Sequence, residues 1–578
     1  MKKTLIALLL LLVPASSLKS QETDLGLRSN TGLVVSGSDV ASDLSAAVLG
    51  RGGNAVDAAV ANAFAMAVTY PFAGNLGGGG FMVVRTPDGK STTFDYREVA
   101  PGKATPTMYL GADGNIDIRL TSTGYLAPGV PGTVRGMALA HKRFGKLAWK
   151  DVVTPAAELA AKGFKISKSL ADSLNGELGL SDSGRGGGMK PYPASMAAYG
   201  KPGGKPWVAG DTIVQPDLAR TLSAIATDGP DAFYTGWIAD RISEDMAAHG
   251  GLITKADLAG YAAKEREPVK GTFLGYEIIA MPPPSSGGVA LVEMLNMLEA
   301  LEIQKKPHGS VDAMHAMIEA MRRGYLDRAR FLGDPDFVKV PVADLTSKSH
   351  AKDMLKTFDA KRASSSVDLG ADIVSKAAYP ESDDTTHFVV LDRDGMAVSN
   401  TYTLEGGYGS HVVIAGTGVL LNNEMGDFNK KPGTTDLRGN IGTPPNVIAP
   451  GKRMLSSMTP VIVTKNGKVA LVTGSPGGRT IINTVLDVVL NVTAYGMSGR
   501  DAVDGPRMHH QWLPDSTTVE ENGSSEAKLA SLRLLGHTIE MRGVQGSAQT
   551  IWIQPETGFA FGVADRRSVT SKASRPEK

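Results

Sequence analysis

The stretch Glu381–His387, with the sequence ESDDTTH, combines acidic residues, two threonines and a histidine directly before a predicted strand. A threonine at a new N-terminus carries a hydroxyl nucleophile and a free α-amine, so the amine can act as general base without a separate triad. The preceding segment Lys361–Tyr379 is polar and weakly patterned, which predicts an exposed linker. The same residues also suit an ordinary strand-opening turn capped by Asp and Thr. The stretch is therefore either a self-cleavage site that creates a threonine nucleophile or a turn.

A second chemically suggestive stretch is Ser475–Gly478, SPGG, which leads directly into the apolar run Arg479–Val492. Glycines at a strand-to-helix turn expose backbone amides, and a helix N-terminus favours negative charge. Such a turn can stabilise an oxyanion. It can also be a plain connection between a strand and a helix, and the four residues alone do not separate the two interpretations.

The elements that would position these residues follow from periodicity and turn chemistry. Residues Asp39–Val68 predict two Ala-rich helices that break at Arg51–Gly53. Apolar alternation around TPDG, DRDG, KNG and PETG turns predicts β-hairpins near 81–96, 386–404, 460–474 and 550–565. Amphipathic segments predict helices at 149–162, 216–227, 289–301 and 311–332. The pattern indicates antiparallel sheet with helices on its faces.

Composition excludes several classes of protein and site. The 578 residues carry 60 Lys and Arg against 59 Asp and Glu, a net charge of +1, which favours neither nucleic acid nor an anionic membrane as partner. Hydrophobic residues make up 42%, as in globular proteins. The absence of cysteine excludes a disulfide scaffold, a Cys-ligated zinc site and a thiol nucleophile.

The N-terminus has the features of a secretory signal peptide. Lys2 and Lys3 precede the apolar run Leu5–Val13, and small residues follow. The run is too short to span a bilayer, and no other stretch is long and apolar enough. We therefore expect residues 1–20, with an approximate end, to be removed, and the mature protein to be periplasmic or secreted, with no membrane attachment.

Two other conspicuous motifs are better explained by structure. Gly77–Gly80 is not followed by the Lys-Ser/Thr of a phosphate-binding loop, so we expect close backbone packing there. His509 and His510 are adjacent and would point differently on any regular element, which makes a poor metal pair. No zinc or calcium spacing appears, so no metal and no cofactor is expected.

Eight blocks in order resemble those of the γ-glutamyltranspeptidase family, and they cover most of the chain from about residue 30 to 567. They are GNLGGGGFM, YRE, MPPPSSGG, RFLGDPDFVKVP, LNNEMGDF, LSSMTP, TGSPGG and PRMHHQWLPD, together with DTTHFVVLDRDGMAVSNTYTL at Asp384. The resemblance implies an α+β fold, the four-layer αββα sandwich of N-terminal-nucleophile hydrolases. It implies a precursor that cleaves itself into a large subunit, 21–384, and a small subunit, 385–578, which build the fold jointly as a heterodimer.

The resemblance also assigns catalytic roles. Thr385 would be the nucleophile, released by cleavage of the Asp384–Thr385 bond. Thr403 would hydrogen-bond its hydroxyl, and Gly477 and Gly478 would offer backbone N–H groups to the oxyanion.

A γ-glutamyl group carries an α-carboxylate and an α-ammonium on one carbon, so its site needs a cation with hydroxyls and a set of acids. The resemblance implies that Arg97, Ser456 and Ser457 bind the carboxylate. Arginine suits this because its fork binds a carboxylate in bidentate fashion. It implies that Glu405, Glu424 and Asp427 bind the ammonium.

The sequence departs from the family pattern at two places. Glu405 replaces a common Asn, which makes the site more acidic. The loop Asn429–Arg453 has the length and the Pro/Gly content of the lid in bacterial members, but it contains no aromatic that could gate the site, and Arg438 stands at the expected gate position.

Together these features predict a hydrolase and transferase that cleaves γ-glutamyl amides such as glutathione and passes the group to water, amino acids or peptides. Two alternatives stay open. One is a β-lactam side-chain acylase of the same fold, acting on glutaryl-like groups without an α-ammonium. The other is an exported binding protein that has lost the chemistry.

Overall fold

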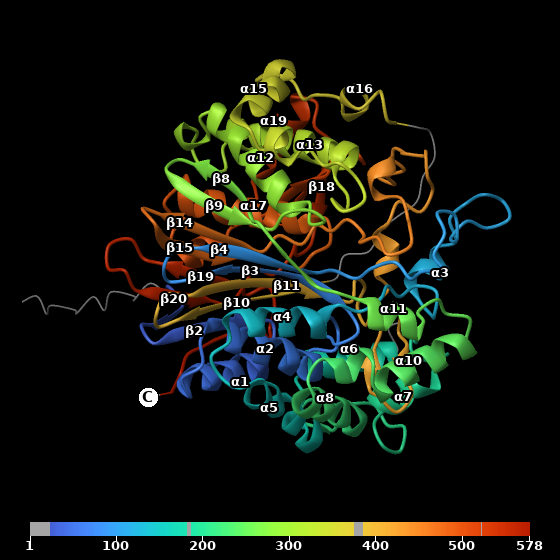
Figure 1. Ribbon diagram of the computed structural model, residues 1–578. Coiled ribbons are helices and arrows are strands. Elements are labelled where there is room, and N and C mark those ends of the chain that lie inside the picture. Colours follow the sequence, from blue (N-terminus) through green and yellow to red (C-terminus); the bar gives the residue numbers. More distant parts are fainter. Residues whose placement is uncertain (1–23, 182–185, 375–384, 522, 578) are drawn as a thin grey trace, which may run out of the picture.

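The computed structural model describes residues 24–181, 186–374, 385–521 and 523–577 (Figure 1). The predicted signal peptide and the residues 375–384, which include Asp384 and the end of the predicted linker, lie outside the described residues. Within the described ranges, no helix combines the length and the apolar character needed to cross a membrane.

Two seven-stranded antiparallel sheets form the centre of the molecule (Figure 1). In spatial order, the first sheet consists of β1 (Leu27–Ser29), β20 (Ala560–Val563), β19 (Thr550–Ile553), β15 (Lys468–Thr473), β14 (Val461–Lys465), β9 (Tyr276–Ala280) and β8 (Val269–Phe273). The second consists of β21 (Lys572–Ser574), β2 (Gly32–Ser36), β10 (Thr386–Asp392), β11 (Ala397–Thr403), β3 (Gly79–Arg85), β4 (Ser91–Tyr96) and β7 (Lys264–Arg266).

Helices cover the outer faces of both sheets (Figure 1). Beside the second sheet lie α1 (Asp39–Gly50), α2 (Ala55–Thr69), α4 (Thr133–Phe144), α5 (Trp149–Lys162) and α8 (Pro216–Asp228). Beside the first lie α12 (Gly287–Ala300), α13 (Val311–Phe331), α15 (Lys348–Met354), α17 (Thr480–Thr493) and α19 (Glu526–Leu534). The arrangement is the predicted αββα sandwich.

Shorter elements complete the chain. The remaining helices are α3 (Ile118–Ser122), α6 (Lys168–Glu177), α7 (Pro193–Tyr199), α9 (Asp231–Tyr234), α10 (Trp237–Ala248), α11 (Lys255–Gly260), α14 (Val342–Leu345), α16 (Ser366–Leu369) and α18 (Gly499–Asp504). The remaining strands are β5 (Phe164–Lys165), β6 (Thr212–Ile213), β12 (Val413–Ile414), β13 (Val419–Leu420), β16 (Met508–His510), β17 (Thr517–Glu520) and β18 (Ile539–Arg542). The 3₁₀ turns are η1 (Ile303–Lys305), η2 (Leu355–Thr357), η3 (Glu424–Asp427) and η4 (Pro444–Asn446).

The central strands of the second sheet are buried on both faces, because the first sheet covers one face and helices cover the other; these strands are β2, β10, β11 and β3. In β2, Leu33 and Val35 face the core between the sheets, and Val34 faces the core under α1 and α2. This is the period-two alternation of a strand. In α2 all 15 residues are buried, and its many alanines let neighbouring elements approach closely.

Both sheets interleave strands from the two sides of Thr385. In the second sheet, β10 pairs with β2 and β11 pairs with β3, so strands that follow Thr385 lie between strands that precede it. In the first sheet, β14 pairs with β9 in the same way. The two sides of the predicted cleavage site therefore share both hydrophobic cores.

All four predicted hairpins are confirmed as the antiparallel pairs β3–β4, β10–β11, β14–β15 and β19–β20. The two Ala-rich helices and the four amphipathic helices are confirmed as α1, α2, α5, α8, α12 and α13.

The exposed-linker prediction is correct only in part for residues 361–374, most of which are exposed or half-buried. That part contains α16, whose Ser366 is fully buried. Its backbone N–H donates to Asp515 at 2.8 Å, and its carbonyl accepts the indole N–H of Trp512 at 2.8 Å. Tertiary contacts hold a segment whose own sequence carries little pattern.

Candidate active site

The predicted nucleophile, Thr385, directly precedes β10 and is 6% exposed. Because Thr386 pairs with Tyr402 across the β10–β11 hairpin, Thr385 lies at the register position next to Thr403. Both threonines line the same pocket. Thr403 Oγ1 accepts the backbone N–H of Glu405 at 2.9 Å, which fixes this hydroxyl at the mouth of the hairpin. Strand register thus brings together two residues that are 18 positions apart in the numbering.

The glycine run before β3 fits against this hairpin. A Cβ added to Gly78 would lie 2.0 Å from the carbonyl oxygen of Thr403. Side chains do not tolerate such a contact, so glycine is needed for the backbones to approach. The expected close packing at Gly77–Gly80 is confirmed.

His387, two residues after Thr385, is not placed to act as its general base. Its Nδ1 lies 2.8 Å from Thr401 Oγ1, and its ring packs against Gly474. Burial lowers the pKa of His387 to about 3, so the imidazole stays neutral at physiological pH. The histidine therefore supports the hairpin.

Gly477 and Gly478 form the turn between β15 and α17, as the sequence predicts. Their φ angles of +131° and +55° are in the left-handed region that favours glycine. Gly478 lines the pocket, while the carbonyl of Gly477 accepts the N–H and hydroxyl of Thr480 at 3.0 and 2.7 Å. Among the described residues, neither glycine N–H donates a hydrogen bond within the chain. Of these two N–H groups, the one of Gly478 belongs to a residue that lines the pocket, whereas Gly477 is not among the lining residues.

At the other end of the pocket, Arg97 is fully buried and forms ion pairs with Glu424 and Asp427. Glu424 is 1% exposed, whereas the side chain of Asp427 is 34% exposed. Backbone carbonyls of Met454 and Leu455 accept further bonds from the guanidinium at 3.3 and 3.4 Å. Residues separated by more than 300 positions thus meet in one charged cluster.

The sequence analysis missed Glu98, which belongs to this cluster. Its carboxylate is fully buried and lies 3.7 Å from Arg97 Nη1, and burial raises its pKa to about 7. Burial also raises the pKa of Glu424 well above its ordinary value; Arg97 opposes this shift and neighbouring carboxylates reinforce it. One guanidinium thus faces three carboxyl groups, so the cluster has an excess of acid. The YRE motif contained the signal, but it did not reveal that the Glu is buried.

Glu405 also lines the pocket and adds to the negative potential at Glu424. Its φ of +79° is left-handed, a conformation that Asn adopts more readily than Glu. The common Asn at this position therefore has a backbone reason, and Glu405 bears some strain.

Ser456 and Ser457 line the same pocket. Ser456 Oγ accepts the N–H of Met458 at 3.1 Å, and Ser457 Oγ accepts a bond from Arg328 at 3.1 Å. Arg328 also donates to Ser286 Oγ at 2.9 Å. Arg328 and Arg479 also line the pocket. The sequence analysis missed both, because a position next to a motif does not show where the side chain points.

The lid-length loop 429–453 is folded over one side of the pocket. Lys430, Lys431 and Asn440 line it, whereas Arg438, at the expected gate position, is exposed and does not. Asn440 Nδ2 donates to Asp436 at 2.7 Å, and Arg479 donates to the carbonyl of Gly439 at 2.9 Å. The loop is thus tied to the turn between β15 and α17, and a gate made by residue 438 is not seen among the described residues.

These positions can be compared with known proteins. The sequence model described as gamma-glutamyltranspeptidase matches residues 41–574. The chain belongs to the γ-glutamyltranspeptidase family. A glutathione hydrolase proenzyme from Escherichia coli (strain K12) is 46% identical over 543 residues, which is 94% of this chain and 91% of the relative. This similarity over almost the whole length of both chains supports an enzyme activity of this family.

Acylases are more distant relatives within the same fold. The acylase ACY 1 proenzyme from Pseudomonas sp. (strain SE83) is 38% identical and covers 92% of both chains. Among solved structures, the cephalosporin acylase from Bacillus halodurans has a TM-score of 0.81 and 25% identity, covering 99% of this chain and 100% of that chain. The Helicobacter pylori γ-glutamyltranspeptidase has a TM-score of 0.53 and 43% identity, covering 56% of this chain and 90% of that chain.

Proposed function

We propose that this γ-glutamyl hydrolase and transferase is a self-processing enzyme that uses Thr385 as its nucleophile. One observation carries the proposal: Thr385 and Thr403 line the same pocket as the Arg97–Glu424–Asp427 cluster. To hydrolyse an amide on an amino-acid side chain, an enzyme needs charges of both signs to bind the head group and a nucleophile nearby to attack the amide. Glutathione and related γ-glutamyl compounds are the proposed donors.

Processing would begin with attack of the Thr385 hydroxyl on the carbonyl of Asp384. The amide would become an ester, and water would then hydrolyse it to leave 21–384 and 385–578 as two subunits. The proenzyme names of relatives support a precursor.

In the mature enzyme the free α-amine of Thr385 would take the hydroxyl proton as the oxygen attacks the γ-carbonyl. The N–H groups of Gly477 and Gly478 would hold the oxyanion. The leaving amine departs with a proton, and a γ-glutamyl ester remains on Thr385. Water, an amino acid or a peptide then attacks that ester and releases the enzyme.

The head group would be held by exchange of charged partners. Its α-carboxylate would form an ion pair with the guanidinium of Arg97 and accept hydrogen bonds from the hydroxyls of Ser456 and Ser457. Its α-ammonium would pair with the carboxylates of Glu405, Glu424 and Asp427. Because a zwitterionic head group brings one charge of each sign, it can enter the ion-pair cluster without leaving a buried charge uncompensated.

An acylase function has support from relatives that carry that name and share the fold. A glutaryl group keeps a carboxylate for Arg97 but has no ammonium for the acids. The excess of carboxyl groups around Arg97 therefore favours γ-glutamyl donors. Export is also a proposal, since it rests on residues 1–20 alone.

The test is a denaturing gel of purified protein and N-terminal sequencing of the smaller band, followed by assays on γ-glutamyl and glutaryl p-nitroanilides. Two bands, with the smaller beginning at Thr385, and a preference for the γ-glutamyl donor are expected. An uncut active chain would refute the processing step, and a glutaryl preference would make the protein an acylase.

A further inference from the structure

The proposed oxyanion turn, Ser475–Gly478, packs against a segment that is distant in the sequence, Gln545–Ala548. The backbone N–H of Ser547 donates to Ser475 Oγ at 3.0 Å, and this hydroxyl donates to the carbonyl of Pro476 at 2.7 Å. Ser475 is fully buried. One side chain thus fixes the peptide that leads into Gly477.

Gly546 makes this contact unusually tight. Its φ is +66°, and an added Cβ would lie 2.5 Å from Ser475 Oγ and 2.9 Å from the carbonyl oxygen of Pro476. The Cα of Gly546 also lies 3.4 Å from the place where a Cβ on Gly477 would be. The two loops are therefore in van der Waals contact, with no space for adjustment.

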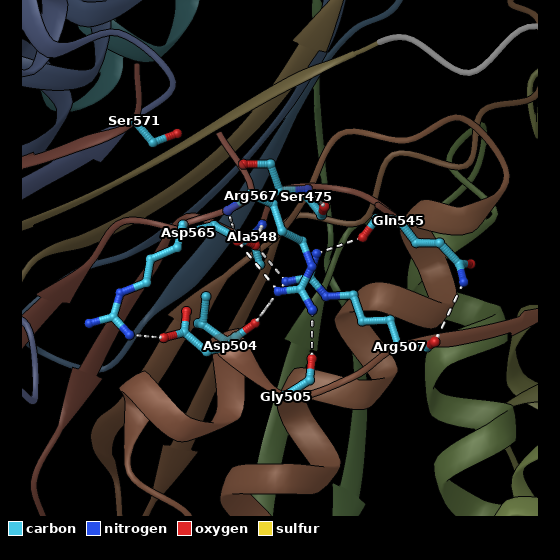
Figure 2. Close-up of polar contacts among 12 residues, drawn as sticks. Ser475, Asp504, Gly505, Arg507, Gln545, Ala548, Asp565, Arg567 and Ser571 are labelled. Atoms are coloured by element: carbon cyan, nitrogen blue, oxygen red, sulfur yellow. Dashed lines mark hydrogen bonds and ion pairs between the residues drawn. The ribbon is translucent and has the colours of Figure 1, made fainter. Parts of the chain in front are cut away.

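A buried ion pair anchors the segment from behind, as Figure 2 shows. Arg507 donates to the carbonyl of Gln545 at 2.6 Å and to Asp565 Oδ2 at 2.5 Å. The same oxygen of Asp565 accepts the N–H of Ala548 at 2.7 Å. Arg507 and Asp565 are 2% and 1% exposed, so their bonds are shielded from water.

A second pair completes the anchor. Glu520 accepts the N–H of Gln545 at 2.9 Å, and Arg567 donates to Glu520 at 2.8 and 2.6 Å. Arg567 Nη1 also lies 3.5 Å from Asp565 Oδ1. Two guanidinium groups and two carboxylates balance in charge, and they hold both ends of the segment.

We propose that Ser475 and Gly546 are positioning residues for the oxyanion site, and that the Arg507–Asp565 pair holds the segment against which the site is set. Glycine has no side chain to fix the direction of its own N–H, and Gly477 and Gly478 are adjacent. Their amides need an external support if they are to point at a developing charge. The proposal rests on the proposed function, because it assumes that these amides bind the oxyanion.

Ser475→Ala tests the hydrogen bond. The variant should fold, since it loses one atom, and kcat for γ-glutamyl p-nitroanilide should fall about tenfold with KM unchanged, because the oxyanion forms only in the transition state. A boronic acid analogue of the γ-glutamyl group, which forms a tetrahedral adduct with the nucleophile, should lose affinity in the same proportion. Binding of glutamate should not change.

Gly546→Ala tests the contact from the opposite direction, by pushing on Ser475 and Pro476. We expect kcat to fall at least tenfold, again at constant KM. Adding Ser475→Ala should recover part of that loss, because the closest clash is with the serine hydroxyl. If the two residues mattered only for stability, combining the two substitutions would not restore kcat.

Gly558→Ala is the matched control, because Gly558 has a similar φ of +72° and no atom within 4 Å of an added Cβ. It should leave kcat unchanged. Unchanged kcat in Ser475→Ala, or losses in the double variant that simply add, would overturn the inference. A wild-type protein that does not hydrolyse the γ-glutamyl substrate would instead refute the proposed function.

Discussion

The two ends of the pocket are constructed in different ways. At the proposed nucleophile end, hydroxyl and backbone groups come from Thr385, Thr403, Gly477 and Gly478, and strand register and glycine turns set their positions. At the proposed head-group end, Arg97 directly follows β4, Glu424 and Asp427 both lie on η3, and these two parts of the chain meet through charge. A hydroxyl nucleophile needs exact direction, whereas ionic recognition tolerates small shifts because Coulomb energy falls slowly with distance. Changes at the two ends should therefore have different kinetic consequences.

The largest effect should follow from Thr385→Ala at the nucleophile end. Without the hydroxyl there is no attack on the preceding carbonyl and no acyl-enzyme, so the protein should be a single uncut and inactive chain. A denaturing gel and the p-nitroanilide assay measure both. Thr385→Ser keeps a hydroxyl and should still be cut. Cleavage of the alanine variant at the same bond would disprove the nucleophile assignment.

Arg97→Ala should cause the largest loss at the head-group end. A charge-assisted bond contributes about 1.5–3 kcal/mol, so kcat/KM should fall roughly 10–150-fold. Glutaryl and γ-glutamyl donors should both suffer, since both carry the carboxylate. Arg119→Ala, an exposed arginine with a side chain 87% accessible, is the control. Full activity of Arg97→Ala on either donor would show that the carboxylate binds elsewhere.

Asp427→Ala should separate the two donors. The γ-glutamyl substrate should again lose roughly 10–150-fold in kcat/KM, because its ammonium loses a charged partner. The glutaryl substrate should lose little or gain, because the variant removes a partly buried acid that it cannot pair. Equal losses on the two p-nitroanilides would mean that Asp427 supports structure and does not recognise the ammonium.

Thr403→Val should have a smaller effect, and this effect should be on kcat and not on KM. Loss of a hydrogen bond to the nucleophile should lower kcat about tenfold with little change in KM. Steady-state kinetics of the processed variant measure this. Thr92→Val, on β4 of the same sheet, controls for damage to the sheet. A variant that raises KM and keeps kcat would place Thr403 in substrate binding.

The smallest effect concerns stability and pH. Burial raises the pKa of Glu98 from an ordinary 4.5 to about 7, so the folded protein binds more protons than the unfolded chain between these values. Stability should therefore fall as pH rises from about 4.5 to 7. Glu98→Gln should flatten this dependence and raise the thermal midpoint at pH 7. Parallel pH curves for the two proteins would mean that folding does not raise the pKa of Glu98.

The two ends also differed in how far the sequence predicted them. The hairpin that carries Thr385 and Thr403 follows from local alternation and a DRDG turn, and it was predicted near 386–404. Its register, which sets Thr385 beside Thr403, comes from the structure. The contact between Arg97 and Glu424 joins positions 327 apart, and no local pattern contains it; a family resemblance suggested the residues but not their direct pairing.

Burial was the property that sequence reasoning missed most often. The sequence did not single out Glu98, and it placed Ser366 in a predicted exposed linker, yet both residues are fully buried. Their environment is created by elements distant in the chain. The SPGG motif pointed to Ser475, but its contact with the segment Gln545–Ala548 could not be predicted for the same reason, since only the fold brings Ser547 to Ser475.

The interleaved sheets have a consequence for the lifetime of the enzyme. With β10 and β11 lying between β2 and β3, neither side of the Asp384–Thr385 bond retains a complete sheet alone. A chain folds in a first-order reaction, but two separated pieces would have to find each other at a rate that depends on concentration. Self-cleavage would therefore make folding a one-way event: the assembled molecule persists behind its unfolding barrier, and dilute, denatured subunits have little chance of return.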